Sequence, residues 1–113
     1  MNKNEWTKEF PCAITICDPI GTILEMNDKA IKTFENDGGA KLVGQNVLAC
    51  HPEPARTQLQ ELLESAQTNV YTIEKKGVKK LIYQAPWYKN DKYCGMVELS
   101  IEIPFEMPHL IRQ

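Results

Sequence analysis

The stretch Ala13–Phe34, which reads A-I-T-I-C-D-P-I-G-T-I-L-E-M-N-D-K-A-I-K-T-F, decides the fold of this chain. Two runs rich in β-branched residues, 13–17 and 22–26, flank the tetrapeptide Asp18-Pro19-Ile20-Gly21. The Asp18 side chain can accept hydrogen bonds from the turn backbone, the proline presets its own φ, and Gly21 accepts a left-handed conformation. The stretch therefore predicts two antiparallel strands joined by a tight turn.

A helix is expected directly after the second strand. Asn27 can act as its N-cap, because the side-chain oxygen can accept a hydrogen bond from a backbone N–H of the first turn. Ala30, Ile31 and Phe34 follow at helical spacing, which indicates one apolar helix face. The chain is thus expected to turn back across the sheet that it has just left.

This order of elements resembles the opening of a PAS sensor domain. The likeness rests on the Asp-to-Gly turn, Asn27-x-x-Ala30, Leu42-Val43-Gly44 and His51-Pro52, and it spans roughly residues 10–103. The resemblance implies an α+β fold: a PAS-like five-stranded antiparallel sheet with helices on one face.

A second major helix is expected after residue 50. The segment His51-Pro52-Glu53-Pro54 suits a first helical turn, where the missing N–H of proline is no loss. An amphipathic stripe at i, i+3, i+4 and i+7 follows, formed by Leu59, Leu62, Leu63 and Ala66. This stripe is expected to face a core.

Three further strands are expected at 70–75, 78–87 and 94–103, which brings the sheet to five strands. The expected organisation is an N-terminal cap segment (1–10), one PAS domain (11–103) and a C-terminal tail (104–113). Two prolines in the tail stop any helix from continuing directly out of the last strand.

Composition argues against several classes of protein. The chain has 113 residues, of which 42% are hydrophobic, and a net charge of −2. These values suit one folded domain and offer no basic face to nucleic acid. No segment is as apolar as a membrane span, residues 1–10 do not resemble a signal peptide, and the four cysteines lack metal-ligand spacing. We expect a cytoplasmic protein with reduced thiols, without a membrane or a direct nucleic-acid partner.

The last strand has two clearly different sides. Residues 97, 99, 101 and 103 are apolar, and they alternate with Met96, Glu98, Ser100 and Glu102. Simple patterning turns the apolar set toward the helices. The register implied by the PAS resemblance does the reverse and places Glu98 beside a cavity, where it needs a partner such as Lys80, a ligand or water. Both assignments stay open at this point, and we prefer the second because it gives the N-terminal aromatic residues a surface to cover.

Under the second assignment a cavity lies between the helices and the sheet. Its expected lining combines apolar walls with a few polar groups, a composition typical of small-molecule sites. The expected ligand-binding residues are Thr15, Met26, Phe34, Leu48, Leu62, Thr72, Ile82, Gln84, Met96, Glu98 and Ser100. Cys17, Leu24 and Val70 are expected on the same side of the sheet. A filled core without a ligand is the alternative, and the sequence names no cofactor.

The opposite face of the sheet would then be too apolar to remain in water. Tyr71, Ile73, Leu81 and Val97 are expected on it. A symmetric homodimer is expected to bury this face. The expected interface residues are Trp6, Phe10, Ile14, Ile16, Tyr83, Leu99 and Ile101.

Catalysis and a metal site are not expected. Asp18, Cys50, His51, Glu98 and His109 are the candidate catalytic groups. Asp18 already has a turn role, and adjacent residues such as Cys50 and His51 do not have the spacing of a triad, whose partners come from separate segments.

The resemblance also raises the question of whether the chain binds haem or flavin. His51 is the residue to compare with the haem histidine of some PAS domains, but its His-Pro context favours a loop or cap role. Val47 stands where flavin-binding light-oxygen-voltage domains carry the adduct-forming cysteine. We therefore expect a sensory and dimerisation module for cytoplasmic signal transduction or transcription regulation, which binds a small ligand in its cavity. The alternative is a ligand-free scaffold for protein–protein interaction.

Overall fold

The computed structural model describes residues 5–113. In this part of the chain a five-stranded antiparallel sheet has the strand order β2-β1-β5-β4-β3. The elements are α1 (Glu5–Lys8), β1 (Ala13–Cys17), β2 (Ile23–Met26), α2 (Asp28–Thr33), three 3₁₀ turns η1 (Glu35–Asp37), η2 (Gly39–Leu42) and η3 (Val47–Cys50), α3 (Ala55–Ser65), β3 (Asn69–Lys75), β4 (Val78–Lys89) and β5 (Lys92–Ile103).

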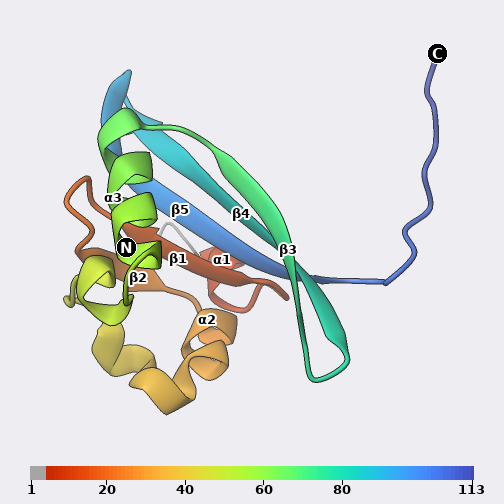
Figure 1. Ribbon diagram of the computed structural model, residues 1–113, viewed down its shortest axis with the longest axis horizontal. Coiled ribbons are helices and arrows are strands. Elements are labelled where there is room, and N and C mark those ends of the chain that lie inside the picture. Colours follow the sequence, from red (N-terminus) through yellow and green to blue (C-terminus); the bar gives the residue numbers. More distant parts are fainter. Residues whose placement is uncertain (1–4) are drawn as a thin grey trace.

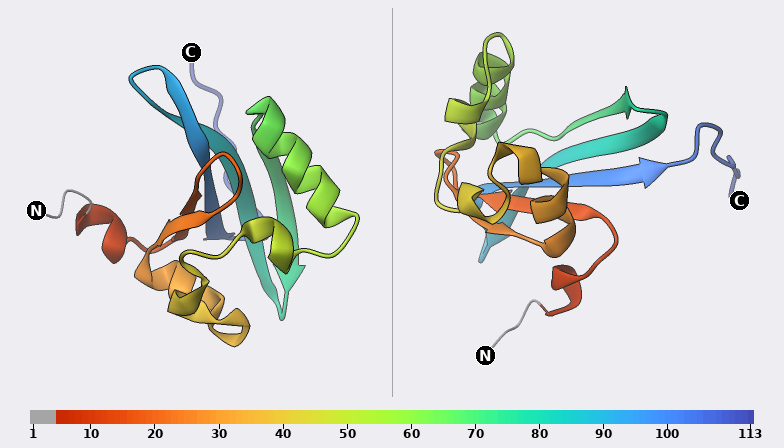
Figure 2. Two further views of the ribbon diagram at one scale, coloured as in Figure 1. Left: turned by 90° about the vertical axis from the view of Figure 1, so that its left-hand side faces the viewer. Right: turned by 90° about the horizontal axis from the view of Figure 1, so that it is seen from below.

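The helices are divided unequally between the two sides of the sheet. Helices α2 and α3 and the 3₁₀ turns cover one face, whereas the short α1 lies behind the other face (Figures 1 and 2). The predicted α+β class is therefore confirmed. We call the side under α3 the helix face and the opposite side the outer face. The first four residues of the predicted cap segment lie outside the described residues.

The Asp-to-Gly turn has the predicted conformation. Asp18 Oδ1 accepts hydrogen bonds from the N–H groups of Ile20 (3.1 Å) and Thr22 (2.9 Å). Gly21 has φ +95° and donates its N–H to the Asp18 carbonyl at 3.0 Å. Since a positive φ strains residues with a Cβ, glycine suits this closing position.

Asn27 does more than cap α2. Its Oδ1 accepts from the N–H groups of Ile14 (2.9 Å) and Ala30 (3.0 Å). Its Nδ2 donates to the carbonyls of Thr7 and Cys12, each at 2.9 Å. The predicted N-cap is thus confirmed, and the same side chain, 6% exposed, also joins α1, β1 and α2.

The register places the polar side of β5 under the helices. Glu98 lies opposite Thr15 of β1 and Gln84 of β4. Met96, two residues earlier, is 3% exposed and packs with Leu63 of α3. The preferred face assignment is therefore confirmed for β1, β4 and β5.

The side chains of β3 lie on the opposite faces of the sheet from those predicted. Tyr71 lies opposite Ile82, and Thr72 lies opposite Leu81. Because directly paired residues share a face, Tyr71 and Ile73 belong to the helix face, whereas Thr72 and Val70 belong to the outer face. The prediction was wrong for these four residues. The two-residue turn Lys76-Gly77 pairs Lys75 with Val78, and this pairing fixes the parity of the hairpin.

Strand β2 contains a second departure from simple alternation. A register shift between Ile16 and Cys17 pairs Cys17 with Ile23, while Thr15 pairs with Met26. Ile23 and Met26 are therefore both buried, and Leu24 is 47% exposed, so the prediction that Leu24 faces the helices was wrong. A bulge explains this, because one extra residue shifts the side chains that follow it.

Glycine is required where β5 passes the end of β1. Gly95 has φ +130°, and a Cβ there would overlap the Cys17 carbonyl oxygen and lie 2.7 Å from the Asp18 Cα. The Trp87 indole N–H donates to the same carbonyl at 3.1 Å. The turn after β1 is therefore held close against β4 and β5.

We expect Gly95→Ala to lower the free energy of unfolding by about 3 kcal/mol, because the backbone of β1 would have to move to admit the methyl group. Urea denaturation measures this change. Gly77→Ala is the matched control, since Gly77 also has positive φ but its Cβ would meet nothing within 4 Å. It should cost about 1 kcal/mol. Equal losses in the two variants would contradict the close-approach argument.

We expect Asn27→Ala to destabilise the fold by about 3 kcal/mol or more, because it leaves several buried backbone groups without partners. Asn27→Asp should also destabilise, since it sets a carboxylate oxygen against the carbonyls of Thr7 and Cys12. Asn36→Ala, at an exposed position of η1, is the control in the same denaturation assay. A change below about 0.5 kcal/mol in Asn27→Ala would contradict the role assigned to this side chain.

Candidate functional site

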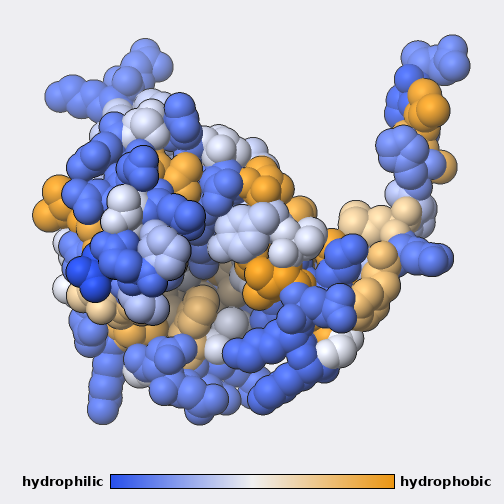
Figure 3. Space-filling model, viewed as in Figure 1, coloured by the Kyte–Doolittle hydropathy of each residue, from blue (hydrophilic) through white to orange (hydrophobic). Residues whose placement is uncertain are grey.

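A cavity of ≈ 440 Å³ lies between the sheet, the 3₁₀ turns and α3. Apolar side chains show between hydrophilic ones on this side of the molecule (Figure 3). The volume falls in the range of small-molecule sites, which is about 300–1,000 Å³. The lining consists of Thr15, Cys17, Ile23, Met26, Phe34, Asp37, Leu42, Val47, Cys50, His51, Leu59, Gln84, Met96 and Glu98.

Two apolar clusters form the walls. One lies under α2 and includes Ile23 and Met26, with Phe34 packed against it. The other lies under α3, where Leu63 and Met96 are buried. The α2 cluster depends on the β2 bulge, which turns two residues three apart in sequence to the same side.

A polar relay crosses the floor of the cavity along three neighbouring strands. Asn69 Nδ2 on β3 donates to Gln84 Oε1 on β4 at 3.0 Å. Gln84 Nε2 donates to Glu98 Oε1 on β5 at 2.8 Å. Gln84 is 8% exposed, so this amide is a buried group with both ends satisfied.

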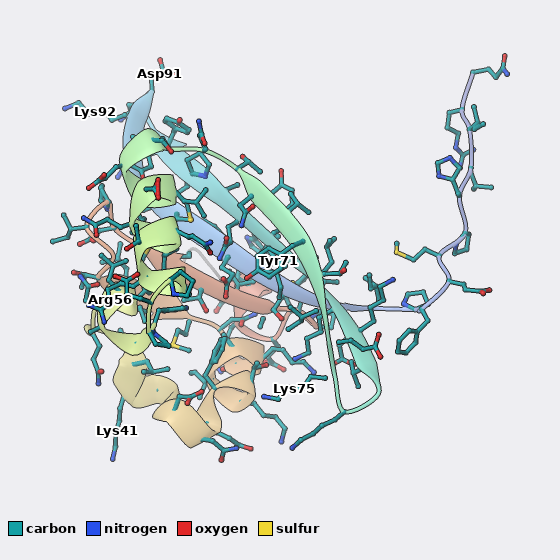
Figure 4. All side chains as sticks on the ribbon, in the orientation of Figure 1. Lys41, Arg56, Tyr71, Lys75, Asp91 and Lys92 are labelled. Atoms are coloured by element: carbon teal, nitrogen blue, oxygen red, sulfur yellow. The ribbon has the colours of Figure 1, made fainter. Side chains whose placement is uncertain are left out.

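The hydrogen-bond partner of Glu98 is Gln84 and not Lys80, which the sequence had suggested. Lys80 lies opposite Glu102 and not opposite Glu98. Tyr71 of β3 lies on the helix face (Figure 4). Burial raises the pKa of its hydroxyl, and the negative charge of Glu98 raises that pKa further. The carboxylate of Glu98 therefore acts across the floor as far as β3.

His51 and Cys50 lie at the margin of the cavity. His51 Nδ1 is 2.7 Å from the Val47 carbonyl oxygen, and the His51 carbonyl accepts from Arg56 Nε at 3.1 Å. Cys50 Sγ lies 3.7 Å from the Asn46 carbonyl oxygen. These bonds hold the end of η3 against the start of α3, so His51 combines the expected loop role with a place in the cavity wall.

The predicted ligand-binding residues fall into three groups. Thr15, Met26, Phe34, Gln84, Met96 and Glu98 line the cavity. Leu48 and Leu62 pack around the cluster under α3, while Ile82 and Ser100 lie opposite each other on the helix face beyond the lining. Thr72 lies on the outer face, because β3 has the opposite parity, and cannot contribute to this cavity. Contact of the other ten with a ligand stays a prediction.

Several lining residues were not among the predicted ligand-binding residues. They are Cys17, which had been expected on this side but not as a ligand contact, and Ile23, Asp37, Leu42, Val47, Cys50, His51 and Leu59. Most of them lie in the β2 bulge or in 3₁₀ turns, where neither a period of two nor one of 3.6 identifies the inward side. The stripe on α3 pointed to Leu59, and the apolar character of Leu42 and Val47 in the connector pointed to those two.

The outer face carries an exposed apolar surface. Ile16, Leu99 and Ile101 are half-buried and Tyr83 is 40% exposed, whereas Ile14, beside α1, is 8% exposed. The ring of Trp6 in α1 and that of Phe10, which follows the helix, pack edge to face with centroids 5.8 Å apart. The two residues are 68% and 44% exposed.

Two other features are absent from residues 5–113. No group of three or more His, Cys, Asp or Glu side chains in that range is arranged to hold a metal ion. The helices of the described chain are all too short or too polar to cross a bilayer. Asp18 bonds its own turn, as the sequence predicted.

No protein-family model and no curated protein matches the chain. Solved structures do match it. A C-terminal domain from Streptococcus mutans has a TM-score of 0.68 at 19% identity, over 86% of this chain and 79% of that chain. The PAS domain of an HTR-like protein from Haloarcula marismortui has a TM-score of 0.61 at 14% identity, over 86% and 85% of the two chains. The chain has the PAS fold.

Another chain of the same fold is the Aer2 receptor of Vibrio cholerae, described as a dual PAS-heme oxygen sensor. It has a TM-score of 0.60 at 17% identity and covers 82% of this chain and 95% of its own. At such identities the likeness concerns the PAS fold and not the ligand.

We expect the thiols of Cys12 and Cys17 to react with iodoacetamide about tenfold or more slowly than that of Cys50. Cys12 and Cys17 are buried and Cys50 is exposed. Burial also raises the pKa of both buried thiols, which lowers their thiolate fraction at neutral pH. Peptide mapping by mass spectrometry measures the rates, with labelling in denaturant as the control. Fast labelling of Cys17 in the native chain would contradict the burial of this thiol.

Proposed function

We propose that this PAS-fold chain is a sensory module that binds a small molecule in the helix-face cavity. The observation that carries the proposal is the chain of hydrogen bonds from Asn69 through Gln84 to Glu98 on the floor of a cavity whose walls are mainly apolar. A core that only needs to be filled gains nothing from a buried glutamine and a carboxylate, since burying polar groups costs free energy. A ligand site needs such groups to orient its ligand.

The proposal includes a homodimer formed through the outer face. Val97 and Leu99 flank Glu98 on β5, so the strand that carries the floor of the cavity also carries the apolar surface behind it. A ligand that moves β5 would therefore alter the contact between two copies. Such a shift between two packings is a direct way to transmit a signal. Trp6 and Phe10 are exposed, and α1 lies behind the outer face (Figures 1 and 2), which supports their assignment to the interface.

A role in cytoplasmic signal transduction or transcription regulation, without catalysis, is part of the proposal. It is supported by the PAS fold shared with sensor histidine kinase regions and with the Aer2 receptor. Four free thiols suit a reducing compartment. A ligand-free interaction scaffold is the second candidate, and the exposed apolar outer face is the observation that favours it.

Native mass spectrometry of the chain purified from its host tests the proposal. We expect a species of twice the chain mass that retains a small molecule. Repeated spectra of an empty dimer would favour the scaffold, and a monomer at micromolar concentration would contradict the interface.

Leu99→Arg should convert the dimer to a monomer, because it places a charge in the centre of the outer face. Leu24→Arg is the matched control, since Leu24 is exposed on β2 and lies outside the proposed interface. It should leave the dimer intact. A dimer that survives Leu99→Arg would show that another surface joins the two copies.

A further inference from the structure

The lining of the cavity carries two carboxylates, those of Glu98 and Asp37, and contains no lysine or arginine within the described chain. Its histidine, His51, has Nδ1 2.7 Å from the Val47 carbonyl oxygen. Arg56 lies close by, but its Nε–H donates to the His51 carbonyl. Lys41 points away from the molecule (Figure 4). The formal negative charge of the lining is therefore not offset by a lysine or an arginine in it.

The direction of the relay fixes how that negative charge is presented. Asn69 donates to the carbonyl end of the Gln84 amide, so the NH₂ end of Gln84 points to Glu98. A carboxylate only accepts hydrogen bonds, which agrees with this order. Glu98 is thus oriented by a buried amide before any ligand arrives, and only one of its two oxygens is engaged by Gln84.

We propose that the cavity binds an organic cation, namely an amine that carries an apolar ring or short chain. The ammonium group would donate to the Glu98 carboxylate in a charge-assisted hydrogen bond, with the Thr15 hydroxyl beside it on β1. The inference rests on the proposed function, because it takes this cavity to be the ligand site.

The walls suit the apolar part of such a molecule. Phe34 supplies an aromatic ring to the lining, and aromatic rings attract cations through their faces. Met26 and Met96 supply flexible, polarisable side chains that adapt to an irregular ligand. An anionic ligand would instead lie against Glu98 and Asp37 and would lose its hydration without gaining a cationic partner.

Three probes of similar size and different charge test the inference. Phenethylamine is the cation, 2-phenylethanol is the neutral analogue and 3-phenylpropionate is the anion. Dissociation constants are measured by ¹H–¹⁵N NMR titration of the full chain at fixed ionic strength and neutral pH. We expect the amine to bind about tenfold more tightly than the alcohol, and the acid to bind most weakly.

Two variants locate the interaction. Glu98→Gln should weaken amine binding about tenfold and leave the alcohol within about twofold. Glu102→Gln should change neither, because Glu102 is an exposed partner of Lys29 at 3.4 Å, outside the lining. The order of the three affinities in the unmodified chain remains a test even where Glu98→Gln does not fold.

The outcomes separate the two proposals. Tighter binding of the alcohol or the acid would overturn the cationic ligand and leave small-molecule binding in the cavity standing. An unchanged amine affinity in folded Glu98→Gln would also overturn it. Shifts confined to the outer face with all three probes would overturn cavity binding itself, and the cationic ligand with it.

Discussion

The side-chain amide of Asn27 is the constraint on which the arrangement of this molecule depends. It is buried, accepts from two backbone N–H groups, and donates to the carbonyls of Thr7 and Cys12 at 2.9 Å and to that of Phe10 at 3.5 Å. An amide has both kinds of group in one rigid plane, whereas a carboxylate or a hydroxyl cannot satisfy all of these positions. Leaving such groups unpaired in the interior would cost more than the bonds contribute when made. The position of α1 relative to β1 and α2 is therefore fixed by this residue together with the ion pair between Lys8 and Asp28, 3.0 Å apart.

The sheet contributes side chains both to the cavity and to the outer face, because adjacent residues of a strand point in opposite directions. On β5 the more polar residues face the helices and the apolar residues face outward. This reverses the usual pattern of a sheet with one solvated side. The reversal allows a carboxylate on the floor of the cavity and an aliphatic contact surface directly behind it. Each residue on the helix face of β5 is thus directly bonded to a residue on the outer face.

Local signals in the sequence were sufficient for much of the fold. The turn at Asp18, the cap at Asn27 and the strand at Ala13–Cys17 were predictable because each depends on neighbouring residues. The face of β5 followed from the resemblance to PAS domains and not from hydrophobic patterning, which favoured the opposite assignment. The parity of β3 was in fact predictable, because the Lys76-Gly77 turn sets it.

The candidate site was predictable only in part. The strand residues of the floor, such as Gln84 and Glu98, followed from register. The wall residues of η1 to η3 did not, because short 3₁₀ turns have no periodic pattern that marks an inward side. The register shift between Ile16 and Cys17 was not predicted either, and with it the inward placement of Ile23 was missed.

Helix α3 is fastened mainly near its C-terminal end. Leu63 is 1% exposed, and its carbonyl accepts a hydrogen bond from the Tyr93 hydroxyl at 2.6 Å. Toward the other end Arg56, Thr57 and Gln58 are exposed, and Leu59 reaches the cavity. The end of α3 that borders the cavity is thus tied to η3 through Arg56 and His51, and its buried end is tied to β5 through Tyr93. A smaller side chain at Leu59 would enlarge the cavity from the α3 side without removing a hydrogen bond between the five strands.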